Sequence, residues 1–388
     1  MNILFVPTKD PRLRNGGNEQ RTNLLWEALK KSGNVYTFLP DHKLERCGCM
    51  IDGKYPIYKF AIRNKNKYTI WYILHWLCSN ITGFSIYRNR ITDNIDPREI
   101  FSGVKFDIVV VRYLYLSCHQ NFWKIAPTYV DIDDHPIQVY ETTRRKHLPI
   151  ALRKIGDFLI RVQTATIIQK TQGGWIANAE QVKMCGENYH FLPNIPNTPS
   201  ENYNRNKKKR NGLLTIGNMA YAPNYNGVSK FLNDVWPSFH EKYPEVEYII
   251  GGMNAPENLV KQWNCINGVK YVGFIDDVEG AYQNCLATVV PVDSGGGTCI
   301  KTLESMSFYR TCLSTPFGAR GLNDYVSKGE GCLHVYRNAS DFMEAFKNLT
   351  NVEKRDREEN ESHKFICQNY SSSSFNEIVF NTISICPK

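Results

Sequence analysis

A glycine-rich turn flanked by charged residues is the stretch of this chain best suited to chemistry. Residues 287–292 form a short apolar, β-branched run, which predicts a strand covered on both faces. Gly295, Gly296 and Gly297 follow it, and without a Cβ their amides can come close to an anion. Thr298 is the expected N-cap of the next helix, whose N-terminus would offer free N–H groups to a phosphate.

Lys301 and Glu304 provide the charged groups of this predicted helix. Three positions separate them, so they lie about 60° apart around the helix axis and can face the same ligand. A cation suits a diphosphate and a carboxylate suits sugar hydroxyls, which predicts a nucleotide-sugar site. A tight strand-to-helix turn with solvated charges is the alternative for any glycine-rich turn taken alone.

The C-terminal half alternates short apolar runs with helical patterns, and several of the runs end at glycines. This order predicts a parallel sheet that binds its ligand at the carboxyl ends of the strands. The expected strands are residues 213–216, 246–250, 269–272, 287–292 and 311–314, and the expected helices are 226–243 and 278–285.

These segments, in this order, resemble the C-terminal domain of glycosyltransferase family 4, which contains retaining enzymes of the GT-B fold. The matching stretches are 216–224, 271–277, 295–304 and 314–322, whereas the N-terminal half matches only loosely. The resemblance implies an α/β protein with two Rossmann-like domains, whose parallel sheets face an interdomain cleft. It also implies transfer of a sugar from a nucleotide-diphosphate sugar to a glycan or lipid-linked acceptor, in surface polysaccharide or glycan assembly. Because Lys301 and a helix N-terminus would hold the diphosphate, no metal and no other cofactor are expected.

The resemblance also implies roles for single residues. The family commonly has two glutamates around this turn; Glu304 matches the second, and Gly296 stands at the first. It tends to have an arginine and a lysine after the strand that ends at Gly217, and here Lys301 is the candidate replacement. Lys301 and Glu304 are therefore the expected catalytic residues of this half. Phe274 and Ile275 are expected beside the base of the donor, and Arg320 is expected as a second cation. The other expected donor-binding residues are Gly217, Asn218, Gly295, Gly296, Gly297 and Thr298.

An acidic turn follows an apolar strand of the N-terminal half, at Asp131, Asp133, Asp134 and His135. In a GT-B enzyme this turn would face the acceptor, so Asp133 and His135 are candidate catalytic residues and Asp134 is a candidate cleft residue. One of the three would position or deprotonate the acceptor hydroxyl. Two alternatives stay open: the metal–diphosphate motif of GT-A transferases, and a strand-ending turn with Pro136 as the breaker.

Another turn of the N-terminal half, Gly16 and Gly17, follows the first strand and leads into a predicted helix over 23–31. In GT-B enzymes such a turn lines the cleft beside the transferred sugar and the acceptor. Arg21, one turn into the helix, is a candidate contact for a phosphate, with a solvated arginine as the alternative.

Length and composition agree with two domains. At 388 residues the chain exceeds what one hydrophobic core usually supports. A polar, basic stretch marks the boundary, and its run 207–210 is interpreted as a solvated linker, with a nucleic-acid or lipid contact as the alternative. The predicted parts are an acceptor domain (1–194), a linker (195–211), a nucleotide-sugar domain (212–365) and a C-terminal segment (366–388) that packs back on the first domain.

The net charge of +9 is partly concentrated just before an aromatic, charge-free segment, residues 68–87. That segment contains Trp71 and Trp76, but its polar residues make it a poor membrane-spanning helix. Such a pattern suits contact with an anionic membrane surface, and an ordinary core helix is the alternative. The basic residues before it are Lys54, Lys59, Arg63, Lys65 and Lys67.

The chain starts with a strand rather than a signal peptide, and its twelve cysteines show no zinc-ligand spacing. These features predict reduced thiols and a cytoplasmic protein. The basic and aromatic segment described above adds the expectation that the protein is peripheral on the inner face of the membrane. Two other functions stay open: a nucleotide-sugar 2-epimerase with the same fold, and a catalytically inactive sugar-nucleotide-binding protein. The second is suggested by Gly296 and by the missing cations after the strand 213–216.

Overall fold

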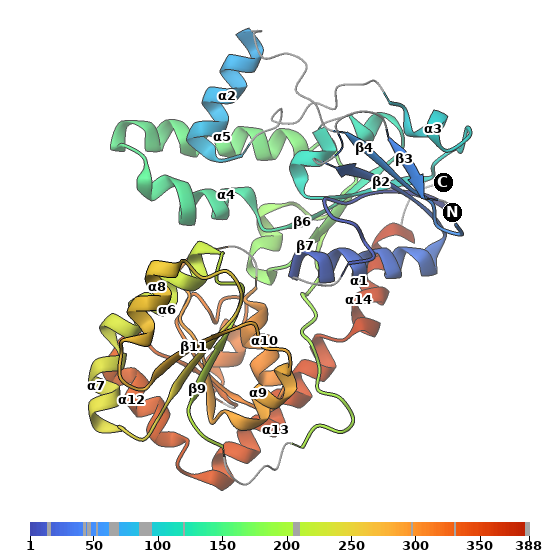
Figure 1. Ribbon diagram of the computed structural model, residues 1–388. Coiled ribbons are helices and arrows are strands. Elements are labelled where there is room, and N and C mark those ends of the chain that lie inside the picture. The colour runs from blue at the N-terminus through green and yellow to red at the C-terminus, as the bar shows by residue number, and fades with distance from the viewer. Residues whose placement is uncertain are drawn as a thin grey trace. The chain divides into compact units, whose positions relative to one another are not determined.

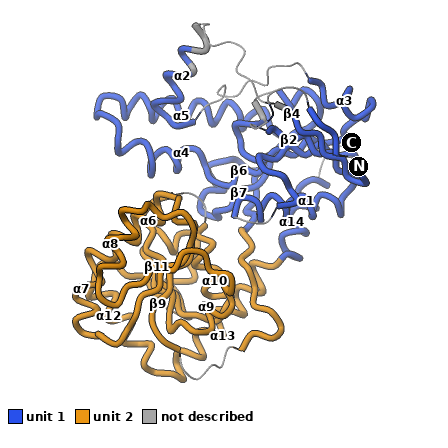
Figure 2. The backbone as a smooth tube through the Cα atoms, viewed as in Figure 1, with its two compact units in different colours: residues 1–193, 372–388 blue, residues 194–371 orange. Residues whose placement is uncertain are grey.

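The computed structural model divides the chain into two compact units (Figure 2). Unit 1 comprises residues 1–193 and 372–388, and unit 2 comprises residues 194–371. Each unit is built around a sheet of mainly parallel strands with helices packed on it (Figure 1). The structure describes residues 1–13, 17–41, 44, 48–51, 53–61, 70–84, 95–118, 121–204, 210–295, 298–329 and 331–384.

The sheet of unit 1 has the strand order β3-β4-β2-β1-β5-β6-β7-β8. Neighbouring strands are parallel except β3 and β4. The central strands β1 and β5 are apolar runs buried on both faces, as strands of a helix-covered parallel sheet are. The strands are β1 (Asn2–Val6), β2 (Asn34–Asp41), β3 (Cys49–Ile51), β4 (Ile57–Ala61), β5 (Ile108–Arg112), β6 (Thr128–Asp133), β7 (Gly173–Ile176) and β8 (Tyr189–Phe191). The helices are α1 (Gly17–Ser32), α2 (Ile70–Thr82), α3 (Pro97–Ile100), α4 (Pro136–Val139), α5 (Ile150–Ile168) and α14 (Ser372–Ser384).

The last helix, α14, belongs to unit 1. It packs beside α1, and the indole Nε1 of Trp175 donates a hydrogen bond of 3.0 Å to the hydroxyl of Thr382. The buried side chains of α14 face unit 1 from one side of the helix, at Phe375, Val379, Thr382 and Ile383. The chain returns to unit 1 at Ser372, later than the predicted start of the C-terminal segment at 366.

The sheet of unit 2 has the strand order β11-β10-β9-β12-β13-β14, with all neighbours parallel. This is the doubly wound arrangement expected from alternating strands and helices. The strands are β9 (Leu213–Ile216), β10 (Tyr248–Gly251), β11 (Val269–Gly273), β12 (Ala287–Val290), β13 (Thr311–Ser314) and β14 (Leu333–Val335). The helices are α6 (Ala222–Asp234), α7 (Trp236–Lys242), α8 (Glu257–Asn264), α9 (Val278–Asn284), α10 (Ile300–Ser307), α11 (Asn323–Ser327), α12 (Ala339–Asn348) and α13 (Val352–Asn369).

The helix predicted over 226–243 is two helices in the structure. The chain breaks between α6 and α7 at Val235. Pro237 lies in the first turn of α7, where proline is favoured because the missing N–H would have no intrahelical partner there. Inside one continuous helix the same proline would clash with the preceding turn.

The stretch predicted as a linker, residues 195–211, packs on unit 2 where the structure describes it. The backbone N–H and the hydroxyl of Ser200 donate to the carboxylate of Glu279, at 2.8 and 2.7 Å. Arg210, predicted to lie in a solvated run, is buried and pairs with Glu359 at 2.6 Å. These contacts make the stretch part of unit 2 rather than a free connection.

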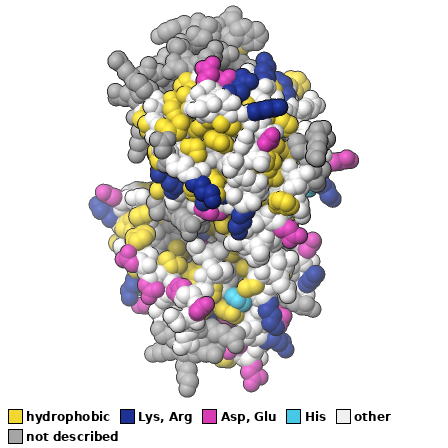
Figure 3. Space-filling model, turned by 90° about the vertical axis from the view of Figure 1, so that its right-hand side faces the viewer, with side chains coloured by type: hydrophobic (Ala, Val, Ile, Leu, Met, Phe, Trp, Pro, Cys, Tyr) yellow, Lys and Arg dark blue, Asp and Glu magenta, His cyan; other side chains and the backbone are white. Residues whose placement is uncertain are grey.

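Charged side chains are mixed on the face of the molecule drawn in Figure 3. Lys and Arg side chains lie beside Asp and Glu there, so the net charge of +9 does not form a single basic patch on that face. Of the basic run before residue 68, Arg63, Lys65 and Lys67 lie outside the described residues, and Lys59 pairs with Asp10 at 3.2 Å. Within the described part of the chain, no helix is both long and apolar enough to cross a bilayer.

Candidate functional site

The strand order of unit 2 reverses between β9 and β12. In doubly wound sheets, ligands bind outside the carboxyl ends of the strands at such a switch point. β9 is followed by Gly217 and Asn218, and β12 leads through Pro291 into the turn at Gly295. Because β9 and β12 are neighbours, they bring together two stretches that the sequence predicts to bind the donor.

The side chain of Lys301 lies across the end of β9. It comes from the first turn of α10, and its Cε would be 2.4 Å from a Cβ built on Gly217. Its Nζ donates to Oδ1 of Asn224 at 3.0 Å, and Nδ2 of Asn224 donates to the carbonyl of Asn218 at 2.7 Å. These contacts hold the ammonium group at the switch point, where a cation can bind an anionic ligand.

Glu304 lies one turn further along α10, and its side chain is partly exposed. Nδ2 of Asn197 donates to its Oε1, and Tyr282 on α9 lies close enough to help lower its pKa. Burial raises the pKa of Glu304, and the hydrogen bonds and the charge of Lys301 offset only part of that rise. A carboxylate can accept several hydrogen bonds, so Glu304 is held in place and still has capacity for a ligand hydroxyl.

The turn before α10 differs from the prediction in one respect. α10 begins at Ile300 with Cys299 as its N-cap, so Thr298 is not the cap, and its side chain is buried. Cys299 makes no side-chain capping hydrogen bond, and the first N–H groups of any helix lack intrahelical partners. Gly295 has a φ of +124°, a conformation that favours glycine. Gly296 and Gly297 lie outside the described residues.

The two residues predicted to meet the base follow β11. Phe274 is exposed, and Ile275 lies against the end of β10, close to Gly251. The ends of β9 and β10 are pressed together, because a Cβ on Gly252 would lie 1.6 Å from the carbonyl oxygen of Gly217. Gly217, which follows β9, and Ile275, which follows β11, therefore lie at the same edge of the sheet as Lys301.

Arg320, the predicted second cation, lies in the loop after β13. Its Nη1 donates to the carbonyl of Phe317 at 2.7 Å, and its guanidinium lies 4.0 Å from the centroid of the Phe317 ring. These contacts tie the side chain to its own loop. A donor contact for Arg320 therefore stays a prediction from the resemblance alone.

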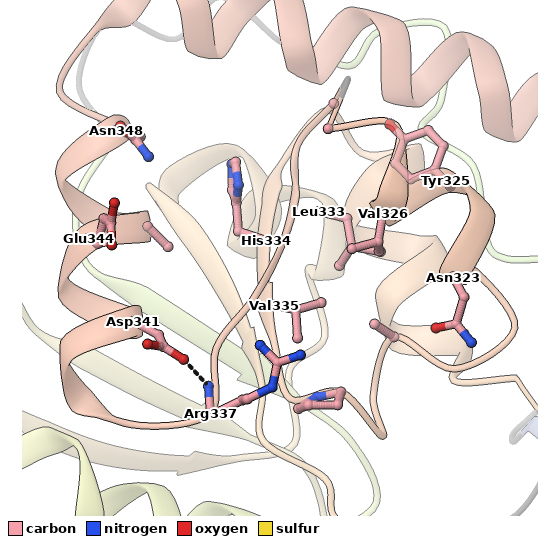
Figure 4. A pocket seen from close by; sticks show the side chains of 15 residues that line it. Asn323, Tyr325, Val326, Leu333, His334, Val335, Arg337, Asp341, Glu344 and Asn348 are labelled. Carbon is pink, nitrogen blue, oxygen red and sulfur yellow. Dashed lines mark hydrogen bonds between the residues drawn. The ribbon is translucent and has the colours of Figure 1, made fainter.

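A cavity of about 450 Å³ lies elsewhere in unit 2, beside the edge strand β14 (Figure 4). Asp341 and Glu344 of α12 line one side, and Asn323 and Tyr325 of α11 line the other. None of the predicted site residues is among its lining residues. This cavity is therefore separate from the site that the sequence predicts.

The acidic turn of unit 1 is built around a buried ion cluster. Asp131, at the carboxyl end of β6, accepts hydrogen bonds from Nε and Nη2 of Arg21 at 3.0 and 2.7 Å, and another from Arg112 on β5. All three side chains are buried. Burial alone would raise the pKa of Asp131, but the two guanidinium groups outweigh it and hold the pKa below its usual value. Because arginines already occupy its oxygens, Asp131 is a poor metal ligand, which argues against the GT-A-type alternative.

The structure contradicts the prediction that Arg21 contacts a phosphate. Besides Asp131, its Nη1 donates to the backbone carbonyls of residues 192–193, at 3.0 and 3.2 Å. A buried guanidinium needs such partners, since an unpaired buried charge is costly. Of the two glycines predicted beside the acceptor, Gly17 is the exposed first residue of α1, and Gly16 lies outside the described residues.

Asp133 is the best-placed carboxylate of this turn for contact with a ligand. A bulge interrupts the pairing of β6 with β7 between Asp131 and Asp133, and Asp133 has a left-handed backbone with φ of +63°. Its side chain is partly exposed and accepts from Nη2 of Arg112 at 3.2 Å. Strained backbone of this kind clusters at functional sites. The neighbouring Asp134 is also partly exposed.

The structure does not support a catalytic role for His135. Its imidazole is buried and caps α4, with Nδ1 accepting from the backbone N–H of Ile137 at 3.3 Å. Burial lowers the pKa of His135 to about 4, so the ring is neutral at pH 7. A buried ring whose Nδ1 serves as a helix cap is not placed to accept a proton from a ligand.

Several residues that hold the predicted site in place were missed by the sequence analysis. Arg112 has a local signal, since it is a polar residue at the carboxyl end of an apolar strand, and Asn224 lies in the first turn of α6, within the stretch 216–224 that carries the resemblance. Asn197 has none, because it reaches Glu304 from a segment far away in the sequence.

The match of unit 2 to a known family decides what kind of domain it is. Residues 210–351 match the family model described as glycosyl transferases group 1. That range contains Lys301, Glu304 and the turn before α10. Unit 2 is a glycosyltransferase domain. A comparison with curated proteins found no match for the chain.

Solved structures show the fold of the whole glycosyltransferase chain. Sucrose-phosphate synthase from Thermosynechococcus elongatus is similar with a TM-score of 0.66 at 12% identity, over 99% of this chain and 98% of that chain. A structure described as trehalose-6-phosphate from E. coli bound with UDP-2-fluoro glucose is similar with a TM-score of 0.67 at 10% identity, over 100% of both chains. A glycosyltransferase from Rickettsia africae has a TM-score of 0.61 at 11% identity, over 99% of both chains.

These comparisons confirm two predictions. The chain has the α/β GT-B fold with two Rossmann-like units, and it is a glycosyltransferase. The epimerase and inactive-protein alternatives are not favoured.

Proposed function

We propose that this protein is a retaining glycosyltransferase that moves a sugar from a nucleotide-diphosphate sugar to a glycan or lipid-linked acceptor, in surface polysaccharide or glycan assembly. The observation that carries the proposal is the position of Lys301 across the end of β9, with Glu304 one turn later on the same helix. The donor diphosphate would bind to Lys301 and to the N-terminus of α10, beside the glycine turn. Glu304 would accept hydrogen bonds from ribose or sugar hydroxyls of the donor.

Fixed positive charge is the main catalytic contribution in this proposal. In the transfer, the bond from the anomeric carbon to the diphosphate oxygen breaks, and its electron pair stays on the diphosphate. A new bond forms from the acceptor oxygen to the anomeric carbon, and the acceptor hydroxyl gives up its proton. Negative charge therefore grows on the diphosphate, and Lys301 stabilises the transition state more than the bound donor. No metal ion is needed for this charge stabilisation.

The acceptor would be bound by unit 1, with Asp133 as our candidate for positioning or deprotonating its hydroxyl. Its partly exposed carboxylate and strained backbone support this role, and Asp134 is the neighbouring alternative. Support for a nucleotide-sugar donor comes from the similar E. coli structure, which is described as bound with UDP-2-fluoro glucose. Support for retention comes from a similar structure of trehalose-6-phosphate synthase described in terms of glycosyl transfer with retention. We place the reaction in the cytoplasm, at the inner face of the membrane.

The experiment that tests the proposal starts from a thermal-shift screen of the purified chain against nucleoside diphosphates and their sugars. With the donor identified, Glu304→Ala should lower donor affinity or rate by roughly 10–150-fold, since it removes a charge-assisted hydrogen bond of about 1.5–3 kcal/mol. Lys301→Ala should lower kcat more than it weakens donor binding, because the leaving diphosphate gains charge only in the transition state.

Lys270→Ala is the matched control, because Lys270 is an exposed lysine of unit 2 that pairs with Glu247 instead. It should leave the kinetics unchanged. The anomeric configuration of the product, read by NMR, should equal that of the donor. Unchanged kinetics in both site variants would place the donor elsewhere, and an inverted product would contradict retention.

A further inference from the structure

The outer face of α5 in unit 1 is apolar and exposed. Ile155, Phe158 and Val162 recur at helical spacing and point away from the buried residues of the same helix. Phe158 is 66% exposed, and Ile150 at the start of the helix is 79% exposed. A helix that is apolar on both its buried and its outer face normally has a partner on each. The buried residues are Gly156, Ile160, Thr164 and Ile167.

The neighbouring helix α2 extends this apolar surface. Residues 70–82 contain no Lys, Arg, Asp or Glu, and α2 packs against α5 where Ile81 approaches Gly156. Figure 1 shows α2 extending from α5 away from the sheet of unit 1. Trp76 is 53% exposed, so this part of the segment is not a core helix. Ile73, Leu74 and Leu77 are exposed beside it, and the side chain of Trp71 lies outside what the structure describes.

Basic residues border the apolar surface. Between Glu141 and Val162 the chain has six basic and two acidic residues, a net charge of +4 with His neutral. Lys154 and Arg161 are exposed on α5, on the side of the helix next to Phe158. Arg144 and Lys146, in the segment before α5, are exposed as well.

We propose that the exposed surface of α2 and α5, with its basic border, binds an anionic membrane surface. Apolar side chains would enter the acyl boundary, and the basic side chains would meet the lipid phosphates. This inference deepens the proposed function, because it names the surface that would keep the enzyme beside a membrane-bound acceptor. A symmetric contact with a second copy would instead bring two basic borders together, and like charges repel.

Vesicle co-sedimentation of the full chain tests the proposal. The wild type should bind vesicles of phosphatidylcholine and phosphatidylglycerol at low salt, release at high salt, and bind neutral phosphatidylcholine vesicles more weakly. Phe158→Ser should reduce binding about tenfold, because a largely exposed phenylalanine can no longer be buried in the lipid. Phe380→Ser is the matched control, since Phe380 is 53% exposed in the same unit but lies on α14.

The charge contribution has its own pair of variants. Lys154→Gln with Arg161→Gln should reduce binding to anionic vesicles roughly thirtyfold at low salt and leave binding to neutral vesicles unchanged. Lys31→Gln with Lys105→Gln is the control, because both lysines are exposed in unit 1, at the end of α1 and before β5 rather than on α2 or α5. Circular dichroism should show the same fold for all variants, since each replaced side chain is exposed.

Two outcomes would overturn the proposal. One is a wild type that ignores anionic vesicles at low salt. The other is a wild type that is dimeric in light scattering and becomes monomeric in Phe158→Ser, which would assign the surface to a second copy. Donor hydrolysis measured without lipid separates this inference from the proposed function, because hydrolysis tests unit 2 and does not depend on the α2 and α5 surface.

Discussion

A single methyl group added at Gly217 tests whether Lys301 belongs to the reaction. The added Cβ would lie 2.4 Å from Cε of Lys301 and 3.3 Å from its Nζ, so the lysine side chain has to leave the end of β9. The nearest atoms belong to side chains and not to the backbone, since Nδ2 of Asn224, at 3.2 Å, is the other close neighbour. We therefore expect Gly217→Ala to fold normally, with the ammonium group displaced and its hydrogen bond to Asn224 broken.

The expected loss follows from the charge that is displaced. A hydrogen bond or contact made by an ionised group contributes about 1.5–3 kcal/mol, so kcat/KM for the donor should fall roughly 10–150-fold in Gly217→Ala. Lys301→Ala should lose at least as much. In the double variant Gly217→Ala with Lys301→Ala, the side chain that the methyl group displaces is already absent, so the methyl group should have no further effect. The coupling energy between the two substitutions should therefore equal almost the whole effect of Gly217→Ala.

The assay is steady-state transfer, or donor hydrolysis, for the four members of this cycle, with thermal unfolding of each. Gly252→Ala is the contrasting variant, because its Cβ would lie 1.6 Å from the backbone of Gly217 and its φ is +142°. It should lower the melting temperature, whereas Gly217→Ala should not. Wild-type kinetics in Gly217→Ala, or losses that simply add in the double variant, would refute the assignment of Lys301.

Three further predictions concern the ion cluster, the buried histidine and the metal. Asp131→Asn leaves Arg21 and Arg112 buried without their carboxylate, so the free energy of unfolding in urea should fall by about 3–5 kcal/mol; a change below 1 kcal/mol would contradict the cluster. The pKa of His135 is lowered to about 4 in the folded chain, whereas in the unfolded chain it is about 6.5. Between these two pH values the unfolded chain binds one more proton than the folded chain. The free energy of unfolding should therefore fall by up to about 3 kcal/mol as the pH drops from 6.5 to 4. His135→Asn, which can still cap α4, should flatten this dependence in denaturant titrations at pH 7 and 4.5, and an unchanged slope would show that another group titrates. Transfer should survive EDTA, because Lys301 and a helix N-terminus would hold the diphosphate; activity lost with EDTA and restored by Mn²⁺ would reverse that conclusion.

Much of unit 2 could be predicted from the sequence because its signals are local. The strands 213–216 and 311–314 were predicted with the bounds that the structure shows, since a short apolar run that ends at a glycine or proline is informative by itself. The prediction of a single helix over 226–243 was wrong, although Pro237 was a local signal that a new helix begins there. Lys301 and Glu304 share one helix, so their spacing alone places them on adjacent parts of its surface.

The sequence by itself determined the alternation of strands and helices, and with it the glycine turn and the helix that carries Lys301 and Glu304. Only the tertiary structure decided which polar side chains bind to other residues of the protein instead of to a ligand. Arg21 lies 110 positions from Asp131, and Asn197 lies 107 positions from Glu304. Local patterns specify backbone conformation, but the burial of a charge depends on partners that the fold brings from distant segments. For the same reason the sequence does not distinguish the exposed outer face of α5 from a core-facing one. Apolar residues at helical spacing indicate a face that is normally covered, but they do not identify the partner that covers it.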